Sequence, residues 1–192
     1  MRARENPFAT DRVLQIRYRL QGETWPGLLQ RLAGLRYRAA IVGPEGTGKT
    51  TLLEDLRPHL EELGFRVRYA FLNAADRTWS WQEMRTICDD LKPGDMILLD
   101  GADHLGRLGW TWLKWRSMSA SGLVITSHRE GMLPTLIQTR TSAELLSQIV
   151  DRLLGDRTSV AKENLAGLFE RHEGNVRDAI RELYDVFARM DG

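Results

Sequence analysis

This chain of 192 residues has little cysteine and no excess of either charge. Cys88 is the one cysteine, which excludes an internal disulfide and a cysteine-rich zinc site. The 27 basic residues nearly balance the 26 acidic ones. The net charge therefore does not indicate nucleic acid or an anionic membrane as a partner. A local basic patch is still compatible with this composition.

Long apolar runs are missing as well. No segment approaches the roughly 20 apolar residues that a membrane-spanning helix needs. The N-terminus, MRARENPFATDR, carries charges without the apolar region of a signal peptide. We therefore expect a cytoplasmic protein without a membrane partner. The 42% of apolar residues is enough to fill the core of one ordinary domain with a small appendage.

Short apolar runs alternate with helical patterns over the first 140 residues, which predicts a parallel sheet with crossover helices. The expected strands are residues 39–42, 66–72, 96–99, 123–126 and 135–139. The expected helices are residues 24–35, residues 49–63, and one that begins at a capping box of Ser80 and Glu83. Pro58 is expected to kink the second helix. The predicted fold class is α/β, with three layers and about five strands.

The pattern changes after about residue 141, where no strand signal remains. Three helices are expected over residues 141–155, 159–172 and 175–190. Thr141 with Glu144 forms a capping box for the first of them, and Asn175 is a good N-cap for the third. We therefore predict a core of residues 1–140, which includes an N-terminal extension, and a small helical subdomain of residues 141–192.

The segment GPEGTGKT lies between the first expected strand and the helix after it, and it matches the phosphate-loop pattern G-x-x-x-x-G-K-[ST] in full. Its glycines let backbone N–H groups turn toward a phosphate, and the helix N-terminus adds partial positive charge. We expect Lys49 to reach the β- and γ-phosphates and the Thr50 hydroxyl to ligate Mg²⁺. The alternative is a glycine-rich turn that binds nothing. The expected nucleotide-binding residues are Gly43, Pro44, Glu45, Gly46, Thr47, Gly48, Lys49, Thr50 and Thr51.

Asp100 ends the expected strand MILLD. The carboxyl ends of parallel strands face the crevice in which ligands of such sheets bind. We therefore predict that Asp100 is the second protein contact of the magnesium ion, beside Thr50. The alternative is an acid that merely ends a strand.

Taken in order, these segments resemble the P-loop NTPases of the AAA+ type. GPEGTGKTT is similar to their Walker A motif, MILLD to Walker B, and LVITS to the sensor 1 strand, with Thr126 or Ser127 at its polar position. GNVRDAI at residues 174–180 resembles the sensor 2 helix of their C-terminal lid, which would put Arg177 over the nucleotide. The resemblance implies a three-layer P-loop NTPase fold with a helical lid, and ATP and Mg²⁺ as cofactors. It implies catalytic roles for Lys49, Asp100, Thr126 and Arg177.

The chain departs from the family pattern directly after Asp100. AAA+ proteins usually carry a glutamate there, which orients the attacking water, and this chain has Gly101. Asp103 is the nearest acid. Either a turn at residues 101–102 brings its carboxylate back to polarise water, or it is an acid at the N-terminus of a helix that runs through Leu113. We keep both readings and count Asp103 among the candidate catalytic residues.

The motifs predict an ATP-binding and slowly ATP-hydrolysing regulatory ATPase, whose nucleotide state controls assembly with itself or with a protein partner. The family trait of an arginine donated between subunits makes Arg129 and Arg140 candidates. One alternative is a P-loop kinase of a nucleotide or small molecule, and another is a nucleotide-dependent binding module without hydrolysis. A translational-type GTPase is disfavoured because the guanine motif N-K-x-D is absent.

An aromatic and basic segment, GWTWLKWRS, follows the Walker B strand. Such a segment could stack nucleic-acid bases or dock a partner. Helical spacing instead favours a packing face made of Leu108, Trp112 and Trp115.

Overall fold

The computed structural model describes residues 6–20, 22–72, 81–155 and 164–190. They form two compact units. The first, here called the sheet unit, comprises Tyr18–Gly43 and Lys49–Thr139, and the second, the helical unit, comprises the described residues of Met1–Arg17, Pro44–Gly48 and Arg140–Gly192. The predicted capping box depends on Ser80, which lies outside the described residues.

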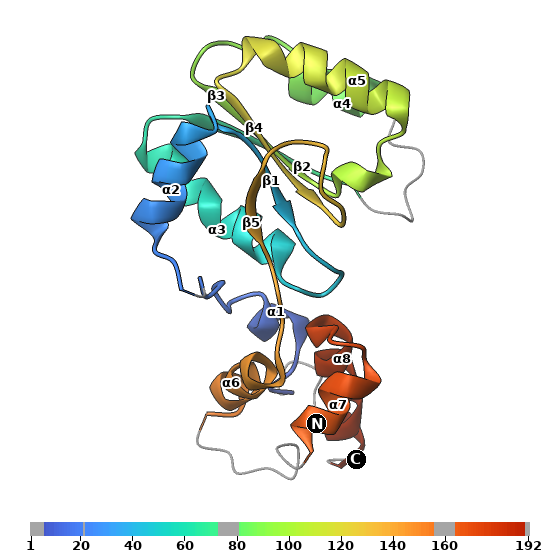
Figure 1. Ribbon diagram of the computed structural model, residues 1–192. Helices are drawn as coiled ribbons and strands as arrows, with labels where there is room; N and C mark the ends of the chain where they lie inside the picture. The colour runs from blue at the N-terminus through green and yellow to red at the C-terminus, as the bar shows by residue number, and fades with distance from the viewer. Residues whose placement is uncertain (1–5, 21, 73–80, 156–163, 191–192) are drawn as a thin grey trace. The chain divides into compact units, whose positions relative to one another are not determined.

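The sheet unit contains one parallel five-stranded sheet (Figure 1). Its strand order is β2-β3-β4-β1-β5, and every neighbouring pair runs parallel. The central strands β3 and β4 are buried along their whole length, as expected for strands covered on both faces. The predicted α/β fold with five strands is therefore confirmed. The strands are β1 Arg38–Val42, β2 Arg66–Phe71, β3 Asp95–Asp100, β4 Gly122–Ser127 and β5 Thr135–Gln138.

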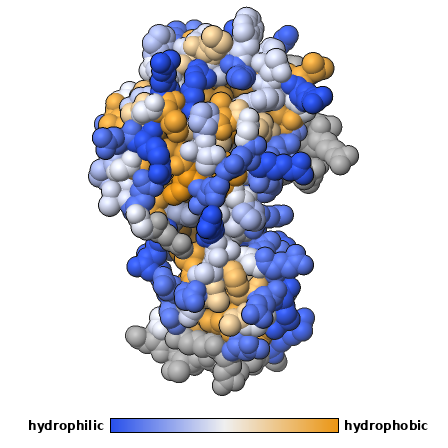
Figure 2. Space-filling model, viewed as in Figure 1, coloured by the Kyte–Doolittle hydropathy of each residue, from blue (hydrophilic) through white to orange (hydrophobic). Residues whose placement is uncertain are grey.

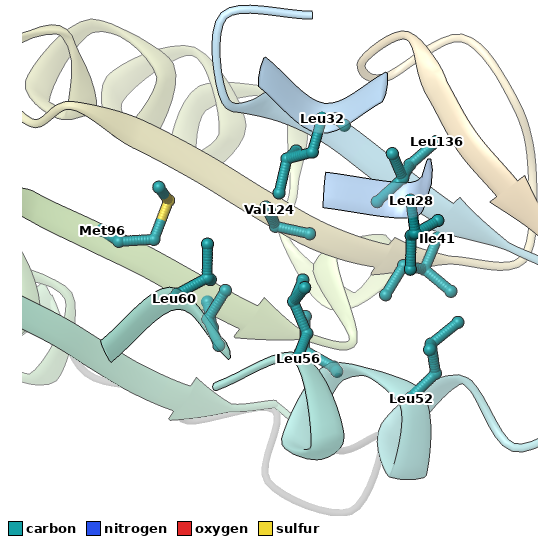
Figure 3. Close-up of a cluster of buried hydrophobic side chains, with 12 residues drawn as sticks. Leu28, Leu32, Ile41, Leu52, Leu56, Leu60, Met96, Val124 and Leu136 are labelled. Carbon is teal, nitrogen blue, oxygen red and sulfur yellow. The ribbon is translucent and has the colours of Figure 1, made fainter. Parts of the chain in front are cut away.

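Helices cover both faces of this sheet. Helices α2 (Trp25–Gly34) and α3 (Lys49–Glu62) pack on one face, and α4 (Trp81–Cys88) and α5 (Arg107–Arg116) pack on the other. Figure 3 shows the first interface, where leucines of α2 and α3 meet side chains from four strands. Alternate residues of β1 serve the two interfaces, because successive side chains of a strand point to opposite faces.

Helix α3 begins inside the phosphate-loop motif, and its position follows from its leucines. Leu52, Leu53, Leu56 and Leu60 are all completely buried. Each such side chain contributes about 1.5–3 kcal/mol relative to exposure, so the start of α3 is fixed against the sheet. The helix continues through Pro58 to Glu62, and Gly64 follows it with φ 88°, a left-handed conformation that glycine adopts without strain.

The helical unit contains four helices among the described residues, each short enough to need a shared core. Phe8, which precedes α1, packs edge-to-face on Phe187 of α8, and Asn6 donates from Nδ2 to the Tyr184 carbonyl at 2.9 Å. The N-terminal residues thus lie with the C-terminal helices, whereas the sequence pattern grouped them with the core. The helices are α1 Thr10–Val13, α6 Ala143–Leu154, α7 Leu165–Arg171 and α8 Val176–Met190.

The predicted cap of α6 was wrong by one residue. Ser142, not Thr141, is the N-cap, because its hydroxyl accepts from the Leu145 backbone N–H at 3.2 Å. The Thr141 hydroxyl donates instead to the Gly174 carbonyl, at 2.7 Å. The cap predicted for α8 is confirmed, since Asn175 Oδ1 accepts from the Asp178 N–H.

The packing face predicted for α5 was wrong for two of its three residues. Leu113 is the buried residue of this helix, and Trp110 and Trp112 pack partly against the same core. Leu108 is 81% exposed and Trp115 is 65% exposed. Helix α5 begins at Arg107, and the face that it turns toward the core is the one that contains Leu113.

The surface carries both hydrophilic and hydrophobic side chains. In Figure 2 hydrophilic residues cover much of the visible surface, and apolar ones show between them. Among the described residues, no helix has both the length and the apolarity that crossing a bilayer requires.

Asp95, at the start of β3, ties the edge strand β2 into the sheet. Its carboxylate is buried and accepts from Arg66 Nε at 2.5 Å, Arg68 Nη2 at 3.1 Å and the Lys92 backbone N–H at 2.9 Å. The hydrogen bond from Arg66 is the largest cause that lowers the pKa of Asp95 to about 2.

We predict that replacing Asp95 with Asn lowers the free energy of unfolding near neutral pH by about 1 kcal/mol, a value reduced for solvent screening of the exposed Arg66. Because the folded-state pKa is depressed, this stabilisation is complete above the unfolded-state pKa, about 4, and is lost as the pH falls toward about 2. Urea unfolding of both proteins as a function of pH measures it. A difference between them that persists unchanged at about pH 2 would contradict the assignment.

Candidate functional site

The phosphate-loop motif joins β1 to α3. Gly46 has φ 71° and Gly48 has φ 83°, so both use the left-handed conformation for which glycine is suited. The Thr47 hydroxyl donates to the Pro44 carbonyl at 2.8 Å and closes the turn. The motif's glycines therefore have a conformational reason, in addition to their match to the pattern.

Lys49 begins α3 and is largely buried. Its Nζ donates to the Gly43 carbonyl at 2.7 Å, across the base of the loop. A buried ammonium group needs such acceptors, and the phosphate oxygens of a nucleotide are stronger ones.

Asp100 joins the ends of three elements. Thr50 Oγ1, at the start of α3, donates to Asp100 Oδ2 at 2.7 Å. Thr126 Oγ1, near the end of β4, donates to Asp100 Oδ1 at 2.5 Å and accepts from the Gly101 N–H at 2.7 Å. The structure thus brings together Thr50, Asp100 and Thr126, three of the residues that the sequence assigned to magnesium or catalysis.

The negative charge of Asp100 acts on two neighbouring titratable groups. Burial raises the pKa of Glu54, one turn after Thr50 on α3, and the charges of Asp100 and Asp55 raise it further. Burial likewise raises the pKa of Tyr69 on β2, with Asp100 and Glu54 as further causes. A divalent cation beside Asp100 would relieve this repulsion between acids.

The donor set fits magnesium bound together with phosphates. A hydroxyl and a carboxylate are hard oxygen ligands, and Mg²⁺ usually takes one or two protein ligands and fills its remaining positions with water and phosphate oxygens. Within the part of the chain that the structure describes, no group of three or more His, Cys, Asp or Glu side chains could hold a metal by itself. Thr50 and Asp100 are the residues that would hold Mg²⁺, and that role remains a prediction.

Gly101 cannot be replaced by a glutamate on this backbone. Its φ is 81°, and a Cβ added there would lie 2.3 Å from the Leu72 carbonyl oxygen. That carbonyl follows β2, whose ladder with β3 is extended by the hydrogen bond from the Leu72 N–H to the Asp100 carbonyl. The glycine at this position, where the family pattern has a glutamate, is therefore required by the path of this chain's own backbone.

Asp103 lies in a 3₁₀ turn, Ala102–His104, that precedes α5. The reading of Asp103 as an acid in the first turn of that helix is wrong, because α5 begins at Arg107. The turn instead directs the carboxylate to the last residue of β4 and the residue after it. Its Oδ1 accepts from Ser127 Oγ at 2.8 Å, and its Oδ2 accepts from the His128 backbone N–H at 2.7 Å and lies 3.2 Å from His128 Nδ1.

Sequence reasoning missed His128 and the contact to Ser127. The signal was the dipeptide Ser-His at the end of β4, which only the fold places beside Asp103. The three candidate arginines, Arg129, Arg140 and Arg177, are all exposed, and their roles stay predictions.

We predict that Gly101→Ala lowers the free energy of unfolding by about 2 kcal/mol, through backbone strain and the clash with Leu72. Gly34→Ala is the matched control, because Gly34 lies in α2 with open space around it, and alanine is favoured in a helix. Denaturant unfolding compares the two. Equal stability of the Gly101 variant and wild type would show that a side chain is tolerated at this position.

No protein-family model and no curated protein matches this chain. Solved structures do match it. A variant of RuvB from Thermotoga maritima has a TM-score of 0.59 at 18% identity, over 89% of this chain and 64% of that one. Domain III of the replication initiation protein DnaA from the same organism has a TM-score of 0.54 at 17% identity, over 85% of this chain and 82% of that one.

A further RuvB structure, described as a Holliday junction branch migration motor, has a TM-score of 0.54 at 19% identity and covers 81% of this chain. This chain spans less than two thirds of the RuvB chains it matches, 64% and 58% of their length. RuvB and DnaA domain III are both AAA+ P-loop ATPases. The chain therefore has the fold of the AAA+ P-loop ATPases.

Proposed function

We propose that this protein binds ATP with Mg²⁺ at residues 43–51 and hydrolyses it slowly, and that its nucleotide state controls assembly with itself or with a protein partner in the cytoplasm. The observation that carries the proposal is the hydrogen bond between Thr50 and Asp100 at the base of a complete phosphate loop. These are the two side chains that would share a magnesium ion in a P-loop NTPase.

The residues of the site have separable tasks. Lys49 would exchange the Gly43 carbonyl for the β- and γ-phosphate oxygens. Thr50 and Asp100 would hold Mg²⁺, and Thr126, fixed by Asp100 and Gly101, would present its hydroxyl near the γ-phosphate. When bound, Mg-ATP supplies the transferable phosphoryl group and the cation that neutralises its charge.

Slow hydrolysis is proposed because position 101 has no side chain to orient water. General base or water-orienting groups contribute typically about 100- to 10,000-fold to such a step. A binding module without hydrolysis is therefore the second candidate, and it is favoured by the same observation at Gly101.

A P-loop kinase is less well supported. Kinases of this class use an arginine-bearing lid that is inserted between later strands. Here only seven residues, 128–134, separate β4 from β5, and Arg129 is the one arginine among them. RuvB is a Holliday junction branch migration motor and DnaA is a replication initiation protein, but the balanced charge of this chain gives no support for a DNA partner.

We predict that wild type binds Mg-ATP and that Lys49→Ala weakens binding about 10- to 100-fold or more, since a charged hydrogen bond contributes about 1.5–3 kcal/mol. Isothermal titration calorimetry measures both affinities. Lys92→Ala is the control, because Lys92 is an exposed lysine outside the loop. A wild type that does not bind ATP contradicts the whole proposal.

Assembly is the second testable part. If an arginine such as Arg129 or Arg140 is donated between copies, Mg-ATP should raise the mass in solution from monomer to at least dimer. Light scattering with ATP, with ADP and without nucleotide reports this mass. A strict monomer in all three conditions would rule out donation between copies and leave assembly with a different protein partner.

A further inference from the structure

The backbone at Gly101 excludes a side chain, so any group that activates water must come from another element. In the sheet unit, the proton-accepting side chains within four residues after β3 and β4 are Asp103, His104, His128 and Glu130, beside Asp100 itself. Glu130 accepts from Gln138 Nε2. Asp100 is committed to the Thr50 and Thr126 hydroxyls. The two oxygens of Asp103 already accept from Ser127 and from the His128 main chain.

We propose that His128, oriented by Asp103, is the group that takes the proton from the attacking water in ATP hydrolysis. The inference rests on the proposed ATPase function. His128 would be the catalytic residue of this step and Asp103 the positioning residue, which acts through the imidazole and not directly on water.

The first support is the geometry of the Asp103–His128 pair. One carboxylate oxygen, Oδ2, accepts from the His128 backbone N–H at 2.7 Å and lies 3.2 Å from the Nδ1 of the same residue. The main chain of His128 is therefore held by this carboxylate, and its ring lies within ion-pair distance of the same oxygen. A carboxylate beside Nδ1 keeps the proton on that nitrogen, which leaves the lone pair on Nε2 to accept another.

The second support is the position of His128 in the sheet. It directly follows β4, whose last residue Ser127 is the register partner of Val42 in β1. The Gly43 N–H donates to the Ser127 carbonyl at 3.1 Å. His128 thus lies where β4 meets the root of the phosphate loop, and β4 is also the strand that carries Thr126 beside the magnesium acid Asp100.

The third support is exposure. The His128 side chain is 42% exposed and the Asp103 side chain 22%. The carboxylate is thus the more shielded member of the pair, and the ring is the member that water reaches. A histidine that acts as a base needs this arrangement, in which Nε2 is accessible to water and Nδ1 is oriented by a carboxylate.

The water oxygen forms a bond to Pγ while the bond between Pγ and the bridging oxygen of ADP breaks. The water proton passes to His128 Nε2, and the imidazolium that results is stabilised by the Asp103 carboxylate. The proton is then returned to the released phosphate or to solvent, so that no further reactant is needed.

The orientation of the ring can be tested without nucleotide. Long-range ¹H–¹⁵N correlation spectra report which ring nitrogen carries the proton in a neutral histidine. We expect Nδ1–H for His128 in wild type and a shift toward Nε2–H in Asp103→Ala, with the signal assigned by its loss in His128→Gln. A His128 ring protonated on Nε2 in wild type would overturn the proposed orientation of the ring by Asp103.

The catalytic part is tested by turnover and binding together. His128→Gln and Asp103→Asn should lower kcat about 100-fold and leave the Kd for Mg-ATP within about twofold of wild type. His104→Gln, an exposed histidine on the neighbouring turn, is the matched control and should keep the wild-type rate. Added imidazole should restore part of the rate in His128→Gly.

The outcomes separate the two proposals. A wild type without Mg-ATP binding ends the proposed function, and the inference with it. A wild type that binds Mg-ATP but never hydrolyses it, or a His128→Gln variant as fast as wild type, overturns the inference and leaves nucleotide binding intact. Loss of binding in the His128 variants, or no rescue by imidazole, would show a structural role and would overturn it as well.

Discussion

The buried carboxylate of Asp100 is the interaction on which the site depends. A carboxylate with 4% exposure must be hydrogen-bonded or paired, because leaving water costs it several kcal/mol. Here two threonine hydroxyls satisfy it, one from the start of α3 and one from β4. The same carboxylate therefore fixes the start of α3 against β4, the strand that carries Thr126. A magnesium ion would enter an arrangement that is already assembled, in which Thr50 needs only to turn its hydroxyl lone pair toward the ion.

A second constraint follows directly after Asp100. At Gly101 the left-handed main chain runs so close to the Leu72 carbonyl that an added Cβ would clash with its oxygen. The chain then enters the 3₁₀ turn of residues 102–104. This path excludes the usual glutamate, and it also brings Asp103 to Ser127 and His128. The exclusion of a side chain at position 101 and the contacts of Asp103 are thus features of the same turn of the main chain. Asp100 and Asp103 each accept a hydrogen bond from a hydroxyl of β4, Asp100 from Thr126 and Asp103 from Ser127.

Much of this could be predicted from sequence where the signal was local. The phosphate loop, the five strands and the Asn175 cap depend on spacing within about ten residues, and the structure has the strands within two residues of their predicted ends. Contacts between distant segments could not be predicted in this way. The partners of Asp103 lie 24 and 25 residues away, and Phe8 reaches Phe187 across the length of the chain. The face of α5 was misjudged because several large apolar residues compete in one short helix, and only the position of the sheet selects Leu113 over Leu108.

The central claim is that Thr50 and Asp100 form the protein side of a magnesium site for ATP. The most direct measurement is calorimetric titration of ATP with and without Mg²⁺, into wild type and into Asp100→Asn. Mg²⁺ should strengthen ATP binding to wild type by about tenfold or more and should have little effect on the variant, because one ligand and the local negative charge are lost. Equal affinities of wild type with and without Mg²⁺, or the same gain in the variant, would contradict the claim.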